Sequence, residues 1–215
     1  GRASHWAYLE DNWPVLPISR ETAIGAADPI VAADGIRLAT RAWAPVEAPR
    51  ATTVIVHGLG EHAGRYEHGA RHVCDHGFAV IAYDHRGHGR SEGRRGALAR
   101  PDDLLRDLER VVDAAREAGA ARLVLLGHSM GGAIAGRFVA EARRPVAGLV
   151  LSSPALDAGL TRFQRARLAV LGALAPGLTV ASGVDPAAVS RDPTVVQAYR
   201  DDPLVHDRVS ARLVR

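Results

Sequence analysis

Short apolar segments alternate with amphipathic segments between residues 50 and 151 of this chain. The apolar segments are rich in β-branched residues and lie at Thr53–Val56, Phe78–Tyr83, Leu123–Leu126 and Gly148–Leu151. Short segments that are apolar on both faces are typical of parallel strands covered by helices on both sides. The pattern therefore predicts an α/β protein with a mostly parallel, doubly wound sheet.

The amphipathic segments between these strands predict helices. The first, over residues 66–76, has an apolar face made of Tyr66, Ala70, Val73 and Cys74. The second, over residues 101–119, has an apolar side made of Leu104, Leu105, Leu108, Val111, Val112 and Ala115. A third helix is expected over residues 130–143, directly after the third apolar segment.

An antiparallel hairpin is expected before the parallel strands. Asp34-Gly35 separates Ile30-Val31 from the apolar run Ile36–Trp43, and Asp-Gly between apolar runs favours a tight hairpin turn. We expect residues 26–154 to form the core of the fold. Residues 1–25 are interpreted as an N-terminal extension whose origin the sequence does not define.

The alternation stops near Ala155, and residues 155–215 are interpreted as a helical cap or lid region that is truncated. Residues 160–176 are amphipathic, with apolar Phe163, Leu168, Val170, Leu171 and Leu174 beside several arginines. This segment is either a lid helix at a lipid surface or a plain core helix. The remaining residues are rich in Pro, Asp and Val and are expected to continue the cap rather than the sheet.

Composition excludes several classes of function. The net charge is only +3, and the arginines are scattered among acidic residues, so no nucleic-acid partner is expected. The single cysteine, Cys74, excludes a disulfide framework and a cysteine metal site, and we expect it to lie in the core. The sequence has no signal-peptide pattern and no apolar run of about 18 residues, which favours a cytoplasmic protein or one peripheral to a membrane.

The strongest chemical signal is Gly127-His128-Ser129-Met130-Gly131, which matches the G-x-S-x-G pattern of a nucleophile elbow. It lies between a predicted strand and a predicted helix, as that motif requires. The chain must turn within one residue, so Ser129 is expected in a strained conformation at a helix N-terminus. The flanking glycines leave room where a Cβ would clash. Ser129 is therefore the predicted nucleophile.

Two further loops follow the ends of predicted strands. The first has the sequence His57-Gly58-Leu59-Gly60-Glu61-His62. We expect Leu59 N–H in this loop and Met130 N–H at the elbow to form an oxyanion hole. The second, Asp84–Ser91, contains groups suited to a metal site or to acid–base chemistry. We instead expect Asp84 and Arg86 to brace neighbouring loops by charge-assisted bonds, so no metal is predicted.

These motifs occur in a fixed order: His57–His62 with Gly64-Arg65-Tyr66, then Tyr83–Gly93, then Gly127–Gly132. The ordered set resembles the monoacylglycerol lipase and lysophospholipase branch of the α/β-hydrolase superfamily over roughly residues 30–210. Ser190-Arg191-Asp192 and Asp202-Pro203-Leu204 also resemble the cap of that family.

The resemblance implies a serine esterase for monoacylglycerols or similar single-chain lipid esters, working without a cofactor. It implies that Ser129 is the nucleophile, that Leu59 and Met130 form the oxyanion hole, and that Glu61, Arg65 and His128 line or brace the polar end of the pocket. The segment 160–176 would be the lid over the acyl chain and would make transient contact with a membrane surface. The oligomeric state cannot be read from the sequence.

A serine hydroxyl needs a base, and in this fold the acid and the histidine follow the nucleophile along the chain. The family places them after two further strands beyond the cap, and no such strands are recognisable here. His206 lies in the expected cap, and the side chain of His128 should point away from Ser129. Either the sequence is incomplete or the chain ends at Arg215. In the second case we expect negligible turnover and an unpaired sheet edge.

Other functions remain open. The same fold serves peptidases that release N-terminal residues, thioesterases and esterases of small esters. A non-catalytic relative that binds lipid is the third class. A fluorophosphonate probe separates the enzymes from the binding protein, because only an enzyme is labelled at Ser129.

Overall fold

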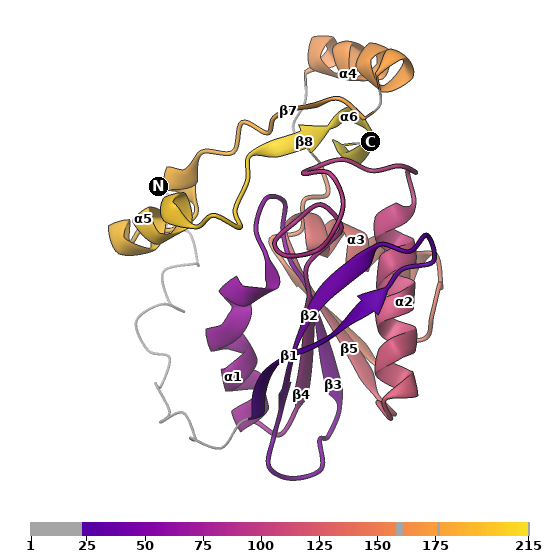
Figure 1. Cartoon of the computed structure of the whole chain (residues 1–215), viewed down its shortest axis with the longest axis vertical. Coiled ribbons are helices and arrows are strands. Elements are labelled where there is room, and N and C mark those ends of the chain that lie inside the picture. The colour runs from indigo at the N-terminus through magenta and orange to yellow at the C-terminus, as the bar shows by residue number, and fades with distance from the viewer. Residues whose placement is uncertain (1–22, 158–160, 176, 215) are drawn as a thin grey trace, which may run out of the picture.

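A computed structural model describes residues 23–157, 161–175 and 177–214 (Figure 1). A six-stranded sheet has the order β1-β2-β4-β3-β5-β6. Its strands are β1 (Ala23–Val31), β2 (Arg37–Ala44), β3 (Thr52–Val56), β4 (Ala79–Tyr83), β5 (Leu123–His128) and β6 (Gly148–Ser152). Strands β3 to β6 run parallel, and β1 and β2 are antiparallel, so the predicted architecture is confirmed. Residues 1–22 of the expected extension lie outside the described residues, and β1 begins at Ala23.

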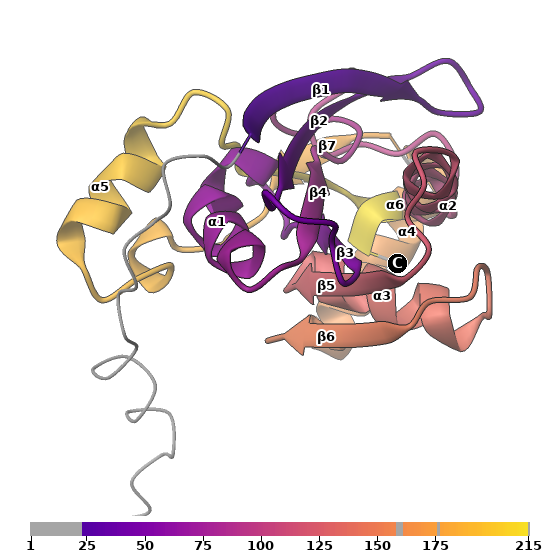
Figure 2. The same ribbon diagram turned by 90° about the horizontal axis from the view of Figure 1, so that it is seen from below.

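Helices cover both faces of this sheet. Helix α1 (Glu67–Asp75) lies on one face, and α2 (Asp103–Glu117) and α3 (Met130–Ala140) lie on the other (Figure 2). Strand β3 serves both cores: Val54 and Val56 pack with α2 and α3, while Ile55 packs with α1. This alternation follows from the two-residue period of a strand.

The predicted helix faces agree with the buried residues. All six apolar residues expected on α2 are buried, and Ala70 and Cys74 are buried on α1. Burial raises the pKa of the Cys74 thiol to about 11, which is the behaviour of a core residue and not of a reactive thiolate.

A buried ion-pair network ties the β1–β2 hairpin to α2. The guanidinium of Arg86 donates two hydrogen bonds of 2.6 Å to Asp107, whose side chain is fully buried. The same group lies 2.7 Å from Asp34 in the hairpin turn and 3.3 Å from Asp103 at the start of α2. The expectation that Arg86 braces neighbouring loops is therefore confirmed.

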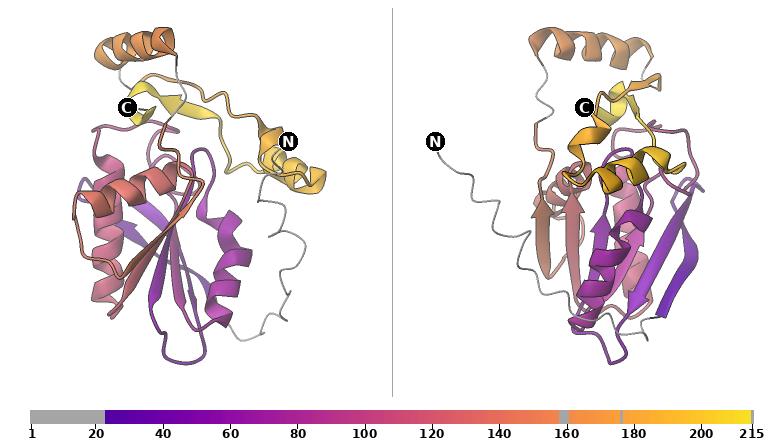
Figure 3. Two further views of the ribbon diagram at one scale, coloured as in Figure 1. Left: turned by 180° about the vertical axis from the view of Figure 1, so that it is seen from behind. Right: turned by 90° about the vertical axis from the view of Figure 1, so that its left-hand side faces the viewer.

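The segment after β6 forms a cap above the carboxyl ends of the parallel strands (Figures 1 and 3). It contains α4 (Arg162–Leu174), β7 (Thr179–Ala181), a 3-10 turn η3 (Pro186–Ala188), α5 (Pro193–Asp201), β8 (Arg208–Ser210) and α6 (Ala211–Val214). Strands β7 and β8 pair antiparallel as a separate small sheet, which the hydrophobic pattern did not predict. Each strand is only three residues long, which is too short for a readable period.

Helix α4 is not a core helix, so that alternative is wrong. Phe163 is 72% exposed and Leu174 is 81% exposed, and Val170 is also exposed. The helix stands away from the main sheet, on the far side of the β7–β8 pair (Figure 3). At the edge of the main sheet, Val150 and Leu151 of β6 are exposed as well, and no described strand pairs with the outer side of β6.

Replacing Arg86 tests the ion-pair network. In Arg86→Met, three carboxylates lose their shared cation, and we expect the free energy of unfolding to fall by about 3–5 kcal/mol. Arg106→Met is the matched control, since Arg106 pairs with Asp102 on the surface of α2 and its loss should matter far less. Urea unfolding followed by circular dichroism measures both. Equal losses in the two variants would contradict a structural role for the buried network.

Candidate active site

Ser129 has the backbone geometry of a strained elbow. Its φ of 51° and ψ of −119° are unusual for a residue with a Cβ, and it stands between the end of β5 and the start of α3. Its N–H donates to Ser152 O at 3.0 Å, and its carbonyl accepts from Ala133 N–H and Ala155 N–H. These bonds to β6, to α3 and to the chain beyond β6 fix the turn from several sides.

The glycines around Ser129 are required by close backbone contacts. A Cβ on Gly131 would lie 2.0 Å from Val56 O and 2.5 Å from His57 O. A Cβ on Gly127 would lie 2.5 Å from Gly131 O. The absence of side chains therefore lets the start of α3 contact the end of β3, as the spacing of the motif predicted.

This contact brings the loop after β3 against the nucleophile. A Cβ on Gly58 would lie only 3.3 Å from Ser129 Cβ. Within the described chain, neither Leu59 N–H nor Met130 N–H donates a hydrogen bond, because the first amides of a helix lack intrahelical acceptors and the loop offers none. The structure thus supplies two free amide donors beside a partly buried serine. Their role as an oxyanion hole stays a prediction.

Glu61 holds this loop in shape. Its Oε1 accepts from Gly58 N–H and from Tyr66 O–H, both at 2.6 Å, and its Oε2 lies 3.3 Å from Arg65 Nε. Burial and the charge of Glu61 raise the pKa of Tyr66 well above its usual value, so the phenol remains a hydrogen-bond donor. Of the predicted pocket residues, Glu61 and Arg65 therefore brace the loop.

The cap is joined to the same loop by three contacts. The His206 N–H donates to Gly60 O at 2.9 Å, His62 Nε2 lies 2.8 Å from Asp202 Oδ2, and the Arg65 guanidinium stacks over Tyr199 at 4.6 Å. Burial favours a higher pKa for Asp202, but its bonds to His62 and to Leu204 N–H outweigh this effect and lower the pKa. Asp202 therefore stays ionised and holds His62 in place.

The described residues offer no base for Ser129. Within them, the Ser129 hydroxyl makes no hydrogen bond to a histidine. His128 turns away, with its Nδ1 3.0 Å from Ser152 Oγ. The ring of His206 packs 4.5 Å from that of His88, and its Nδ1 accepts from Arg208 N–H. The side chain of His128 therefore points away from Ser129, as expected, and His206 lies between α5 and β8.

Three buried histidines, His57, His85 and His88, pack against one another next to the loop after β3. His57 Nε2 accepts from His85 N–H at 2.9 Å, so its Nδ1 carries the proton and donates to Gly58 O at 2.7 Å. Burial, followed by the charges of neighbouring histidines, lowers the pKa of His57, His85 and His88 well below the usual value. These imidazoles are neutral packing groups near pH 7.

Asp84 links the loop after β4 to the end of the loop after β3, which carries the Leu59 amide. Its carboxylate accepts from Ala63 N–H at 2.7 Å and from Arg90 N–H at 2.8 Å. This confirms the predicted bracing role of Asp84. In the described ranges, no group of three or more His, Cys, Asp or Glu side chains is arranged to hold a metal ion.

Sequence reasoning missed the pairing of His62 with Asp202. These residues are 140 positions apart, and no local pattern connects them. Both belong to segments that resemble the same family, and this shared likeness is the one signal in the sequence that relates them.

The family model described as serine aminopeptidase, S33, matches residues 47–215 of the chain. A monoacylglycerol lipase of Mycolicibacterium smegmatis is 43% identical over 175 residues, covering 80% of this chain and 62% of that protein. The human monoglyceride lipase is 39% identical over 180 residues, covering 82% of this chain and 59% of that protein. The chain thus spans about three fifths of the length of these two curated relatives.

Solved structures have the same fold. The monoacylglycerol lipase of Paleococcus ferrophilus superposes with a TM-score of 0.71 at 36% identity, covering 83% of this chain and 67% of that one. A soluble variant of the Saccharomyces cerevisiae monoglyceride lipase, crystallised with a substrate analogue, superposes with a TM-score of 0.72. The match covers 89% of this chain and 68% of that one. At 21% identity, the second likeness concerns the fold alone.

Replacing Gly131 tests the close contact at the elbow. In Gly131→Ala the new methyl group meets Val56 O, so we expect unfolding free energy to drop by about 1–3 kcal/mol. Gly136→Ala in the same helix is the control. It has open space around its Cβ and should stabilise the protein by about 0.5–1 kcal/mol. Chemical denaturation measures both, and stabilisation by Gly131→Ala would refute the contact.

The buried histidines predict acid sensitivity. The unfolded chain takes up protons on imidazole below about pH 6.5, whereas the folded chain resists them, so stability should be lost as the pH falls from 7 to 5. His85→Gln should flatten the dependence of unfolding free energy on pH by up to about 1.4 kcal/mol per pH unit. His68→Gln, at an exposed position on α1, is the control. An unchanged slope in His85→Gln would exclude the proposed titration.

Proposed function

Since this chain belongs to the serine aminopeptidase S33 family and has the α/β-hydrolase fold, we propose that the whole protein is a serine hydrolase that cleaves carboxylic esters of single-chain lipids. One observation carries the proposal: a strained, partly buried serine lies against the loop after β3, and the N–H groups of Leu59 and Met130 have no acceptor within the described chain. The curated relatives described as monoacylglycerol lipases support the choice of substrate class.

The proposed reaction begins with attack of Ser129 Oγ on the ester carbonyl. The carbonyl oxygen becomes an oxyanion, which accepts hydrogen bonds from Leu59 N–H and Met130 N–H. Each preorganised donor can lower the barrier by about 3 kcal/mol, judging by the loss when such a donor is removed. Collapse of the tetrahedral intermediate expels the alcohol and leaves an acyl-enzyme on Ser129, which water then hydrolyses.

The base that takes the proton of Ser129 is proposed to come from a part of the whole protein other than these 215 residues, together with the acid that orients it. The described residues offer no candidate, and the chain spans only 59 to 62% of the curated relatives. Residues 1–215 alone should therefore hydrolyse esters at a negligible rate.

The polar and apolar parts of a lipid ester would meet different parts of the protein. Arg65 and His128 would brace the polar end of the pocket, where the alcohol group would leave, Arg65 through its ion pair with Glu61 and His128 through its bond to Ser152. The exposed apolar side chains of α4, with Phe163 and Leu174 among them, would cover the acyl chain or contact a membrane surface. Within the described chain, no helix has the length and apolar character needed to cross a bilayer.

A second candidate is release of N-terminal residues from peptides. It is favoured by the description of the matched family as serine aminopeptidases. Both candidates use the same nucleophile and the same oxyanion donors, so they differ only in the pocket.

Labelling and hydrolysis of the full-length protein test the proposal. A fluorophosphonate probe should label the wild type, and Ser129→Ala should abolish labelling and lower kcat/KM by at least about a thousandfold. Ser182→Ala is the control and should label normally. Comparing a monoacylglycerol with an aminoacyl amide then separates the two candidates. Labelling that persists in Ser129→Ala, or turnover of the amide alone, would reject the lipid esterase.

A further inference from the structure

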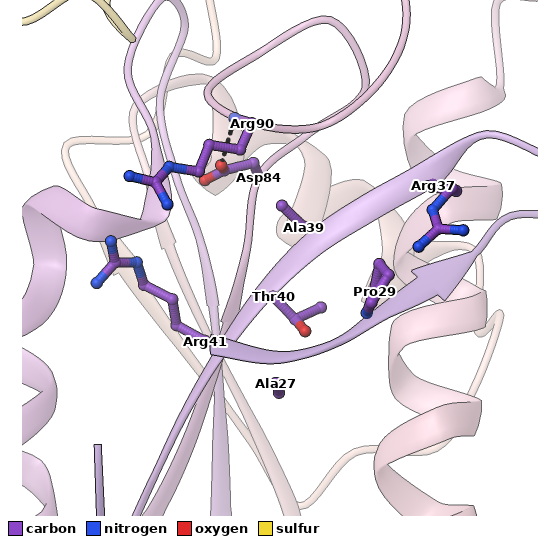
Figure 4. Close-up of a pocket in the computed structure, with 8 residues that line it drawn as sticks. All are labelled: Ala27, Pro29, Arg37, Ala39, Thr40, Arg41, Asp84 and Arg90. Atoms are coloured by element: carbon purple, nitrogen blue, oxygen red, sulfur yellow. Dashed lines mark hydrogen bonds between the residues drawn. The ribbon is translucent and has the colours of Figure 1, made fainter. Parts of the chain in front are cut away.

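A cavity of about 350 Å³ lies beside the antiparallel strands β1 and β2, at the edge of the sheet away from Ser129. It is lined by β1, β2 and the loop after β4, with Ala27, Pro29, Arg37, Ala39, Thr40, Arg41, Asp84 and Arg90 at its surface (Figure 4). Strand β2 is three places from β5 in the sheet, a lateral separation of about 14 Å. The cavity is therefore distinct from the candidate active site.

The charged residues that line this cavity are three arginines and one aspartate. Figure 4 shows the guanidinium groups of Arg41 and Arg90 on the same side of the cavity, with Arg37 at the other end. The carboxylate of Asp84 is already bound by two backbone amides, those of Ala63 and Arg90. Among the described residues, Arg41 has one ion pair, at 3.6 Å, with Glu67.

That remaining ion pair is shared. Glu67 also accepts from Arg71 at 2.8 Å, so one carboxylate serves two arginines. Among the residues that the structure describes, the side chains of Arg37 and Arg90 pair with no carboxylate. Like charges on one wall of a cavity destabilise the fold unless an anion or solvent compensates them.

We propose that this cavity binds a phosphate group. A carboxylate matches one guanidinium fork, whereas the three free oxygens of a phosphate monoester can accept from Arg41 and Arg90 together. The cavity is also lined by Ala27, Pro29 and Ala39, whose small apolar side chains leave room for the organic part of the ester. The phosphate comes from a soluble ion or ester or from the headgroup of an anionic phospholipid, since both present the same chemistry.

The first test titrates inorganic phosphate into the full-length protein at constant ionic strength, followed by calorimetry. Saturable binding is expected, and Arg90→Gln or Arg41→Gln should weaken it about tenfold. Arg122→Gln is the matched control, because Arg122 is an exposed arginine directly before the first residue of β5 and does not line the cavity. The affinity of the Arg122→Gln variant for phosphate should stay within about twofold of that of the wild type. Melting temperatures without phosphate verify that each variant folds.

The second test separates the two sources of phosphate. Sedimentation with phosphatidylcholine vesicles is compared with sedimentation on vesicles that also contain phosphatidic acid. Retention that depends on phosphatidic acid and on Arg90 assigns the phosphate to a lipid headgroup, whereas binding of free phosphate without retention assigns it to a soluble ligand. The proposal is overturned if neither form binds saturably, or if Arg122→Gln weakens binding as much as Arg90→Gln does.

Discussion

The contact between the start of α3 and the end of β3 is the constraint on which the candidate active site depends. Gly131 approaches Val56 O so closely that no side chain fits, and the turn at Ser129, two residues earlier, has a strained conformation. The same contact places the loop after β3 beside the serine. The position of the nucleophile and the position of the free amides are thus set by one packing requirement, and the strain is held by bonds to β6 and α3.

Around that contact, ionised and neutral groups have separate tasks. Arg86 and its carboxylates join the hairpin to α2, and Asp84 joins the loop after β4 to the loop after β3. The buried histidines His57, His85 and His88 stay neutral, and His57 accepts a hydrogen bond from His85 N–H and donates one to Gly58 O. Rigid support of this kind is what preorganised donors need, because amides that must reorient during a reaction lose much of their stabilising effect.

Much of this arrangement could be predicted from the sequence because its signals are local. The apolar side of α2, the Asp34-Gly35 turn and the elbow glycines each follow from the period of an element or from steric limits at a turn. The cap was predictable only as a break in the pattern. Its short strands carry no readable period, and the pairing of His62 with Asp202 joins distant segments. The cavity beside Arg41 and Arg90 likewise needs tertiary structure, because β2 and the loop after β4 supply its charges separately.

The bond from His206 N–H to Gly60 O makes the cap part of the loop that carries the Leu59 amide. A chimera that took its cap from a relative but lost residues 199–206 would leave Gly60 without this partner, and the donor geometry would change even though every catalytic side chain was kept. The cap of this protein therefore cannot be exchanged as a whole to change substrate preference. The graft must end before Tyr199, so that the native tether remains with its loop.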